Sequence, residues 1–317
     1  MVKLAGHERR LHHRDRHGHL SDRRHLLGPG DDAALLLPSP GMQLAMTMDT
    51  LLSGRHFPED LPAADIGWRS LAVNLSDLAA MGATPRWCLL SLSLPQVDEL
   101  WLEAFCAGFD ELAGQAGVTL VGGDMVRGPL SITVQASGEV PAGKALLRSG
   151  ARPGDRICLS GIPGQAAAGL QCWQAGKRDG PLVEAFCRPQ PQLDLGRRLR
   201  GLASACIDIS DGLLADLGHI LEDSGGLGAD IRLPLLPRSS ALNSWADEAQ
   251  RQQAQLAGGD DYLLLFTVPP VFNLPAQWRE IGRVEARRGI RVMDAQGNPL
   301  SSLPAGWDHF RGDSGDA

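Results

Sequence analysis

The sequence of 317 residues lacks the features that would place it in several specialised classes of protein. No stretch approaches the roughly 18 apolar residues that a membrane-spanning helix requires, and the N-terminus has no apolar segment typical of signal peptides. A surplus of basic residues is also missing, because 30 Lys and Arg stand against 37 Asp and Glu to give a formal net charge of −7. This charge argues against nucleic acid or an anionic membrane as a partner. We therefore expect a cytoplasmic protein that would bind a polyanion only through cations.

Paired cysteines of the CxxC type are missing as well. Most of the cysteines lie in apolar stretches, which predicts reduced thiols in the core rather than disulfides or a zinc site. The six are Cys88, Cys106, Cys158, Cys172, Cys187 and Cys206.

The composition that is present, 43% hydrophobic and 21% charged residues with 38 glycines, is that of an ordinary globular protein. Its length predicts two compact domains of roughly 150 residues each. Residues 1–25 stand apart, because they hold six of the nine histidines and seven Lys or Arg. Their spacing matches no defined metal or phosphate site, so we expect a solvated, poorly ordered arm.

Hydrophobic periodicity predicts a mixed α/β chain in which a Gly- and Pro-rich segment, residues 148–155, separates two halves. The first half is expected to contain strands over 42–52, 87–95, 118–121 and 131–140, helices over 64–82 and 97–116, and a turn at 122–124. The second half is expected to contain strands over 156–161, 205–210 and 261–268, and helices from Gln165, near 191–202 and over 211–225.

Aspartates recur beside glycines and at the ends of predicted elements. Carboxylate clusters without His or Cys suit hard cations, and magnesium is the usual ion where phosphate is a further ligand. Helix capping and turn formation by Asp would explain any one of these segments equally well. The segments are 30–32, 48–50, 76–78, 122–124, 208–212 and 258–261.

Capping explains the whole set less well. We expect Asp77 and Asp211 at or near the starts of apolar helices, where an acid can cap. Asp124 and Asp208 follow predicted apolar strands, where a carboxylate has no evident structural purpose. Strand ends beside glycine turns are where α/β proteins bind ligands.

Seven blocks of the sequence resemble, in order and spacing, the motifs of thiamine-monophosphate kinases, and they span roughly residues 28–310. The blocks are GPGDDAA, TMDTLLSGRHF, LAVNLSDLAAMGATP, VGGDMVRGPL, LLRSGARPGD, CIDISDGLLADLGHI and LAGGDDY. The wider superfamily includes AIR synthetase, selenophosphate synthetase and a hydrogenase-maturation protein.

The resemblance implies a two-domain AIR-synthetase-like fold, α/β with mixed sheets. After the arm of residues 1–25, residues 26–148 would form a domain that binds ATP and Mg²⁺ and pairs with its counterpart in a homodimer. Residues 149–317 would form a second α/β domain that completes the active site. The implied partners are ATP and thiamine monophosphate, with neither nucleic acid nor a membrane.

The resemblance also implies roles for individual residues, with Asp77, Asp208 and Asp211 central to catalysis. The implied metal-binding positions are Asp32, Thr47, Met48 through its backbone, Asp49, Asp77, Asp124, Asp208 and Asp211. The implied nucleotide-contacting positions are Gly123, Asp124, Arg148 and Ser210, and those implied to hold thiamine monophosphate are His56, Asp260 and Trp307.

The implied reaction is in-line transfer of the γ-phosphoryl group of ATP to thiamine monophosphate, assisted by several Mg²⁺ ions, to give thiamine diphosphate. Its acceptor is already an anion and needs no strong base, so the main obstacle is repulsion between phosphates, which divalent cations relieve. The sequence departs from the family at Asp260 and Leu263, where relatives carry Glu. Another ATP-dependent enzyme of the superfamily, such as AIR synthetase, and a non-catalytic nucleotide- or metal-binding relative remain the alternatives.

Overall fold

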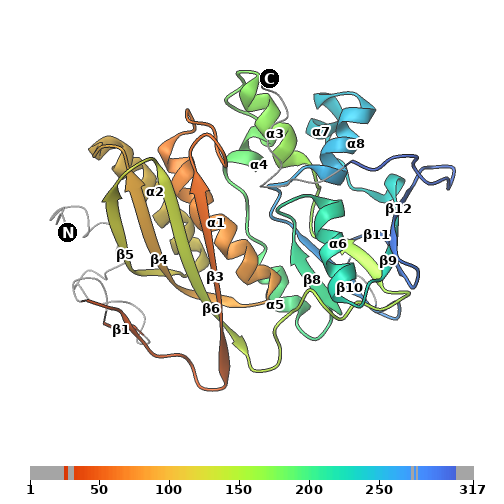
Figure 1. Cartoon of the computed structure of the whole chain (residues 1–317), viewed down its shortest axis with the longest axis horizontal. Helices are drawn as coiled ribbons and strands as arrows, with labels where there is room; N and C mark the ends of the chain where they lie inside the picture. The colour runs from red at the N-terminus through yellow and green to blue at the C-terminus, as the bar shows by residue number, and fades with distance from the viewer. Residues whose placement is uncertain (1–24, 28–31, 273–274, 276–277, 305–317) are drawn as a thin grey trace. The chain divides into compact units, whose positions relative to one another are not determined.

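The computed structural model describes residues 25–27, 32–272, 275 and 278–304. The chain divides into two compact units, Met1–Ala145 and Leu146–Ala317. Both combine helices with a β-sheet, as the periodicity predicted (Figure 1). The N-terminal arm predicted over residues 1–25 lies outside the described residues except for His25, which begins a short strand.

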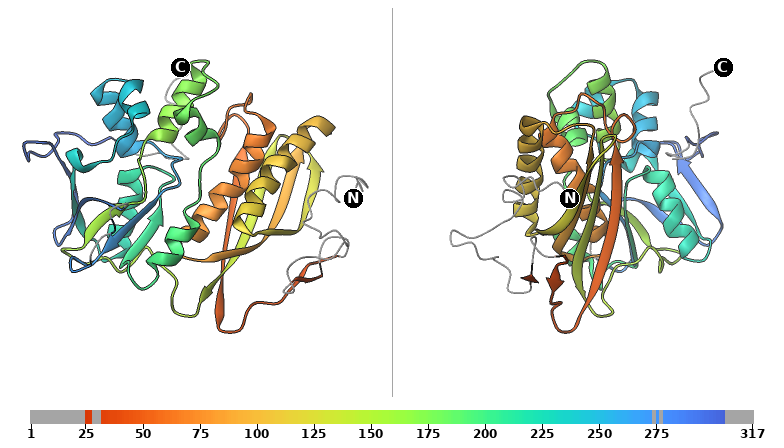
Figure 2. Two further views of the ribbon diagram at one scale, coloured as in Figure 1. Left: turned by 180° about the vertical axis from the view of Figure 1, so that it is seen from behind. Right: turned by 60° about the vertical axis from the view of Figure 1, so that its left-hand side comes forward.

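The first unit contains a four-stranded sheet in the order β3-β6-β4-β5, with β4 and β5 parallel and the other pairs antiparallel. Helices α1 and α2 lie on one face of this sheet (Figure 2). The elements are β1 (His25–Leu27), β2 (Leu35–Leu36), β3 (Met42–Leu52), α1 (Ala63–Ala80), β4 (Thr84–Leu94), α2 (Glu99–Ala116), β5 (Thr119–Arg127) and β6 (Ser131–Pro141).

The two helices approach so closely that two glycines are needed at their contact. A Cβ atom on Gly67 would lie 2.0 Å from the carbonyl oxygen of Phe105, and one on Gly108 would lie 1.8 Å from that of Ala64. Asp98 caps the start of α2 by accepting the N–H groups of Leu100 and Trp101, and Gly117 ends it in the left-handed conformation.

Two predictions for this unit were wrong. Asp77 lies in the last turn of α1, not near a helix start, because the helix begins at Ala63 and its buried face continues through Ser76 and Leu78. The turn predicted at 122–124 is part of β5, whose parallel pairing with β4 continues to Arg127. Gly123 permits that pairing, since a Cβ atom there would lie 1.9 Å from the carbonyl oxygen of Leu90.

The second unit is built on a six-stranded sheet in the order β12-β9-β11-β7-β10-β8, with only the β12–β9 pair parallel. Its apolar core includes Ile157, Ile207, Leu217 and Leu265, from four different elements. The elements are β7 (Arg156–Leu159), α3 (Gln165–Gln174), α4 (Pro181–Cys187), α5 (Leu193–Leu199), β8 (Ala205–Asp208), α6 (Leu213–Asp223), β9 (Gly228–Arg232), the 3₁₀ helix η1 (Leu233–Leu235), α7 (Ser240–Trp245), α8 (Glu248–Ala257), β10 (Leu264–Val268), β11 (Arg279–Glu285) and β12 (Gly289–Met293).

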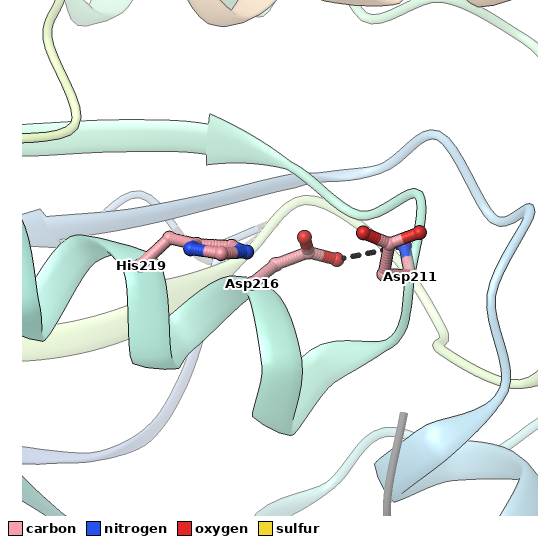
Figure 3. Close-up of side chains that lie close together, drawn as sticks. All are labelled: Asp211, Asp216 and His219. Carbon is pink, nitrogen blue, oxygen red and sulfur yellow. Dashed lines mark hydrogen bonds between the residues drawn. The ribbon is translucent and has the colours of Figure 1, made fainter. Parts of the chain in front are cut away.

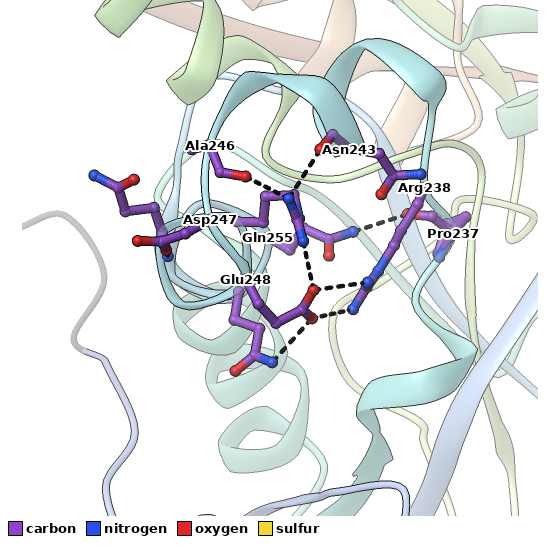
Figure 4. A network of polar contacts seen from close by, with 10 residues as sticks. Pro237, Arg238, Asn243, Ala246, Asp247, Glu248 and Gln255 are labelled. Atoms are coloured by element: carbon purple, nitrogen blue, oxygen red, sulfur yellow. Dashed lines mark hydrogen bonds and ion pairs between the residues drawn. The ribbon is translucent and has the colours of Figure 1, made fainter.

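A charged network fixes the start of α8 (Figure 4). Glu248 accepts hydrogen bonds from Arg238 at 3.1 and 2.6 Å and from Arg251 at 2.7 Å, and these contacts lower the pKa of Glu248 to about 2. Gln255 donates to the carbonyl of Pro237 at 2.8 Å. Residues 258–261 therefore follow a helix whose start is held by these contacts.

The cysteine prediction is confirmed, because all six cysteines fall in the described part of the chain, all are free and five are buried, with Cys106 half-buried. Among the described residues, no helix combines the length and apolar character needed to cross a membrane.

Candidate active site

Four polar residues of the first unit gather where β3 faces α1, and we call Thr47, Asp49, Asn74 and Asp77 the first acid group. Thr47 and Asp49 are on the same side of β3, two residues apart, whereas Asn74 and Asp77 are one turn apart on α1. The Thr47 hydroxyl donates to the Asp77 carboxylate, and the backbone N–H of Asp49 donates to Asn74 Oδ1 at 3.1 Å. Strand and helix thus hold two carboxylates beside one another.

The proximity of these carboxylates shows in their electrostatics. Burial, followed by repulsion from Asp77, raises the pKa of Asp49 to about 6. Near neutral pH the pair is therefore prone to take up a proton or a cation. Asn74 escaped the sequence reasoning, although its position three residues before Asp77 was a usable signal.

Met48 and Asp124 do not join the first acid group. The Met48 side chain is 66% exposed on the opposite face of the sheet, so only its backbone is near the group. Asp124 lies opposite Ser91, in a row of paired residues that also holds Thr133 and Thr50 and that faces away from α1. It is also on the other edge strand, three strand spacings or roughly 14 Å from β3. One copy of the unit does not bring Asp124 to Asp49.

The remaining predicted site residues of the first unit, Asp32, His56 and Gly123, lie on three separate segments of the chain. Asp32 is exposed and precedes β2 by three residues. His56 lies in the turn after β3, where its Nδ1 atom accepts the N–H of Leu52 at 3.0 Å. That contact leaves the proton of the neutral ring on Nε2. Gly123 is exposed within β5.

A second acid group forms in the second unit where β8 leads into α6, and it consists of Asp208, Ser210, Asp211 and Asp216. Asp208 is the last residue of β8 and is 4% exposed. Asp216, in the first turn of α6, turns back toward the loop, and its Oδ2 atom accepts the N–H groups of Ser210, Asp211 and Gly212, each at 3.1 Å. Figure 3 shows the bond from Asp211. The loop is therefore closed upon a buried carboxylate.

Asp216 was not predicted from the sequence, although an acid four residues after the SDG motif was a visible signal. Burial and the nearby charge of Asp211 raise its pKa to about 7, against the opposite effect of the three backbone N–H groups. His219, one turn further along α6, is exposed. One potential ligand atom from each of Asp211, Asp216 and His219 lies within 4.8 Å of the others.

The 258–262 loop lies directly against the second acid group. The N–H of Asp260 donates to the carbonyl of Ser210 at 2.9 Å, and that of Tyr262 donates to the carbonyl of Ile209 at 2.8 Å. Gly259 must lack a side chain, because a Cβ atom there would lie 2.3 Å from the Ser210 carbonyl oxygen. The structure thus brings the predicted substrate position Asp260 together with Asp208, Ser210 and Asp211.

Asp260 itself is held in an unusual conformation. Its φ angle of 67° is in the left-handed region, which Asp tolerates better than most residues, and its Oδ1 atom accepts the Tyr262 hydroxyl at 3.1 Å. The next residue, Asp261, points elsewhere and accepts the N–H groups of Gly164 and Ala166 at the start of α3. Burial raises the pKa of Asp261 to about 7.

Arg148 and Trp307 complete the predicted set. Arg148 is exposed and follows Leu147, whose carbonyl accepts the N–H of Cys206 in β8 at 2.8 Å. Arg148 therefore lies alongside the strand that ends at Asp208. Trp307 lies outside the described residues.

Comparison with known proteins decides the family. Residues 30–140 match the model of the AIR synthase related protein N-terminal domain, which alone leaves several activities open. The thiamine-monophosphate kinase of Salmonella typhimurium is 44% identical over 299 residues, which cover 89% of this chain and 91% of that protein. The chain belongs to the thiamine-monophosphate kinase family.

Solved structures of this family share the fold. The thiamine-monophosphate kinase of Stenotrophomonas maltophilia K279a is 45% identical with a TM-score of 0.82, covering 89% of this chain and 94% of that one. A complex of AaThiL with AMPPCP and TMP is 32% identical with a TM-score of 0.78, covering 86% and 89%. The predicted two-domain fold of the AIR-synthetase type is therefore confirmed.

Proposed function

We propose that this protein is an ATP-dependent kinase that phosphorylates thiamine monophosphate to thiamine diphosphate. The supporting observation is the 44% identity to thiamine-monophosphate kinases over 89% of the chain. The two units hold 145 and 172 residues, so a match of this length must include both. It therefore extends into both units, whereas the family model matches residues 30–140 alone.

The residues of both acid groups fit magnesium. The donors are carboxylates and hydroxyls, which suit a hard cation, and the first acid group has two carboxylates whose mutual repulsion a divalent cation would relieve. We assign the cation-holding roles to Asp49 and Asp77 in the first unit and to Asp208 and Asp211 in the second. Bound Mg²⁺ would neutralise phosphate charge and align the phosphates for transfer.

The protein's own part in the reaction is to bind and to position. The acceptor phosphate is already a nucleophile, so no residue has to act as a strong base, and the acid groups contain none. We assign Arg148, Gly123 and the Ser210 hydroxyl to nucleotide contacts, and Asp32, Asp124 and the Met48 backbone to further cation contacts. His56, Asp260 and Trp307 are assigned to the acceptor, where Asp260 would attract a cationic thiazolium ring.

We also propose a homodimer formed through the sheet face of the first unit that α1 and α2 leave uncovered. Apolar side chains on that face are 40–67% exposed, which is unusual for a surface without a partner. They are Leu44, Met46, Met48, Leu89 and Val126. Asp124 is on the same face, so a second copy would approach it. Met46→Glu should lower the molecular mass measured by light scattering, and an unchanged mass would contradict this interface.

The two units correspond, in this proposal, to a nucleotide-binding and dimerisation domain over residues 26–148 and to a second domain over 149–317. A cytoplasmic location is proposed with them, supported by six free thiols, which suit a reducing compartment.

Product formation tests the function directly. Purified protein with ATP, thiamine monophosphate and Mg²⁺ should form thiamine diphosphate and ADP in equal amounts, and chelation of Mg²⁺ should stop both. The AIR-synthetase alternative predicts no thiamine diphosphate, and ATP turnover only with an acceptor other than thiamine monophosphate. A non-catalytic relative would bind nucleotide and release no ADP with either acceptor.

A further inference from the structure

The start of α6 has the form of an anion-binding site that is already filled from within. Three consecutive N–H groups, from Ser210, Asp211 and Gly212, converge before the helix, as they do in loops that bind phosphate. Here all three donate to one oxygen of Asp216, a side chain that is only 2% exposed. These N–H groups are therefore committed to Asp216 and not to a nucleotide phosphate.

This arrangement determines what the loop can present to a ligand. With the N–H groups turned toward Asp216, the loop offers its side-chain oxygens, those of Ser210 and Asp211. The position of the loop is further fixed by the two bonds from Asp260 and Tyr262 to the carbonyls of Ser210 and Ile209. The backbone N–H groups of Asp260 and Tyr262 thus hold the 209–210 end of this segment, and the Asp216 carboxylate holds residues 210–212.

We propose that Asp216 is a positioning residue that keeps the 210–212 loop in the form in which Asp211 and Ser210 present their oxygens to a cation–nucleotide complex. The inference rests on the proposed kinase function and goes beyond it by assigning a role to a residue without one. Asp216 acts in this view through its Oδ2 atom, which accepts the three N–H groups, and not by binding the cation.

Asp261 offers a matched control in the same unit. It too is a carboxylate whose pKa burial raises to about 7 and that accepts backbone N–H groups at the start of a helix, those of Gly164 and Ala166. Those groups belong to α3, so its loss should destabilise the fold without altering the 210–212 loop. A general structural role for buried carboxylates predicts equal behaviour at both positions.

The test compares Asp216→Asn, Asp216→Glu and Asp261→Asn by two measurements, with thermal unfolding to establish folding. Binding of Mn²⁺ in the presence of a non-hydrolysable ATP analogue is followed by electron paramagnetic resonance, and the Mg²⁺ dependence of turnover is followed separately. We expect Asp216→Asn to weaken Mn²⁺ binding and to raise the Mg²⁺ requirement at least about tenfold. Asp216→Glu keeps the charge and should show a smaller shift in the same direction. Asp261→Asn should leave both values within about twofold.

Two results would overturn the inference. One is an Mn²⁺ affinity equal to that of the wild type in Asp216→Asn or, if only Asp216→Glu folds, in Asp216→Glu. The other is a change of Mn²⁺ affinity in Asp261→Asn as large as that in the Asp216 variant. If neither Asp216 variant folds while Asp261→Asn does, Asp216 is a determinant of folding and the positioning role is rejected. Failure of the kinase function is separate, since the wild-type protein would then form no thiamine diphosphate although the Mn²⁺ comparison could still be made.

Discussion

The two acid groups hold their carboxylates by different physical means. In the first unit, Asp49 and Asp77 stand on a strand and a helix of the packed core, and a neutral amide, Asn74, accepts the backbone N–H of Asp49. In the second unit, Asp211 stands on a loop, and a buried carboxylate, Asp216, accepts three backbone N–H groups to hold it. The strand that carries Asp49 is thus held by one hydrogen bond to a neutral side chain, whereas the loop that carries Asp211 is held by three hydrogen bonds to one carboxylate.

The pKa is raised in both acid groups, at Asp49 and at Asp216, but the surroundings of the two carboxylates differ. Burial and the neighbouring Asp77 raise the pKa of Asp49 to about 6, as expected of a cation ligand. Burial and Asp211 raise the pKa of Asp216 to about 7, while hydrogen bonds from three backbone N–H groups act in the opposite direction, as expected of a structural carboxylate. A raised pKa alone therefore does not distinguish a ligand from its support, whereas the hydrogen-bond partners do.

The largest effect is expected from removing one charge in each acid group. Asp77→Asn and Asp208→Asn preserve volume and should each lower kcat/KM at least about 100-fold, equivalent to ~2.7 kcal/mol of transition-state stabilisation. Asp77→Asn should also keep or raise the Tm in chelator, because repulsion on Asp49 disappears. Steady-state kinetics and thermal unfolding measure both quantities.

Asp98→Ala is the control for these variants, because Asp98 is an acid of the first unit that only caps a helix. Its loss should cost about 1 kcal/mol of stability and leave turnover unchanged. If Asp77→Asn likewise lost stability and kept its turnover, Asp77 would have a purely structural role.

A smaller effect, confined to one substrate, is expected at Asp260. Asp260→Ala should raise the KM for thiamine monophosphate about tenfold and change that for ATP less than about twofold, because only acceptor binding is lost. Tyr262→Phe, which removes the 3.1 Å hydrogen bond to Oδ1, should reproduce part of this change. Asp260→Glu should equal or improve the natural affinity, because the resemblance to the family implies Glu at this position. Weakened ATP binding in these variants would refute the assignment.

A pH-dependent effect on stability should distinguish Asp49. Its folded pKa of about 6 exceeds the ordinary value of 3.8, so the folded state holds the proton more tightly. Without Mg²⁺, the Tm of the wild type relative to Asp49→Asn should therefore fall as the pH rises from about 4 to about 6. Saturating Mg²⁺ should remove that fall by replacing the proton. A Tm difference independent of both pH and Mg²⁺ would show that Asp49 is not a cation ligand.

The smallest effect is expected at Glu248, which begins α8 and belongs to neither acid group. Its pKa of about 2 lies below the ordinary 4.5, so the bonds to Arg238 and Arg251 stabilise the fold above about pH 4.5 and are lost as the pH falls toward 2. Because the side chain is 46% exposed, Glu248→Gln should cost no more than about 1 kcal/mol at neutral pH. Turnover should be unchanged, and denaturation at pH 7 and pH 3 should show a smaller stability difference between the wild type and the variant at pH 3 than at pH 7.

Sequence reasoning succeeded where a local pattern governs the structure. The strands predicted over 42–52 and 131–140 correspond to β3 and β6, and the helix predicted over 97–116 corresponds to α2. The reasoning missed α8, which is predominantly polar, as well as α4, α7, β9, β11 and β12. It also read the two glycines of β5 as a turn, because it could not see the neighbouring strand that requires them.

The candidate site shows the same limit. The acids themselves were visible as motifs, and the spacing of Asn74 and Asp216 from them was a usable signal. The backbone N–H groups that these two side chains accept belong to other elements or turns, and the sequence does not identify them. The place of Asp77 was wrong although the helix itself was predicted over 64–82, because the acid was interpreted as a possible cap while it lies in the last turn of that helix. Contacts between elements, and not propensity, decide these positions.

The most direct test of the account is the turnover of the Asp77→Asn/Asp208→Asn double variant, measured with γ-labelled ATP beside both single variants. If both acid groups serve the same phosphoryl transfer, the double variant should lose little more than the worse single variant, because groups that act as a unit are not additive. Losses that multiply would mean that the two groups act independently. Near-normal turnover in either single variant would contradict the account outright.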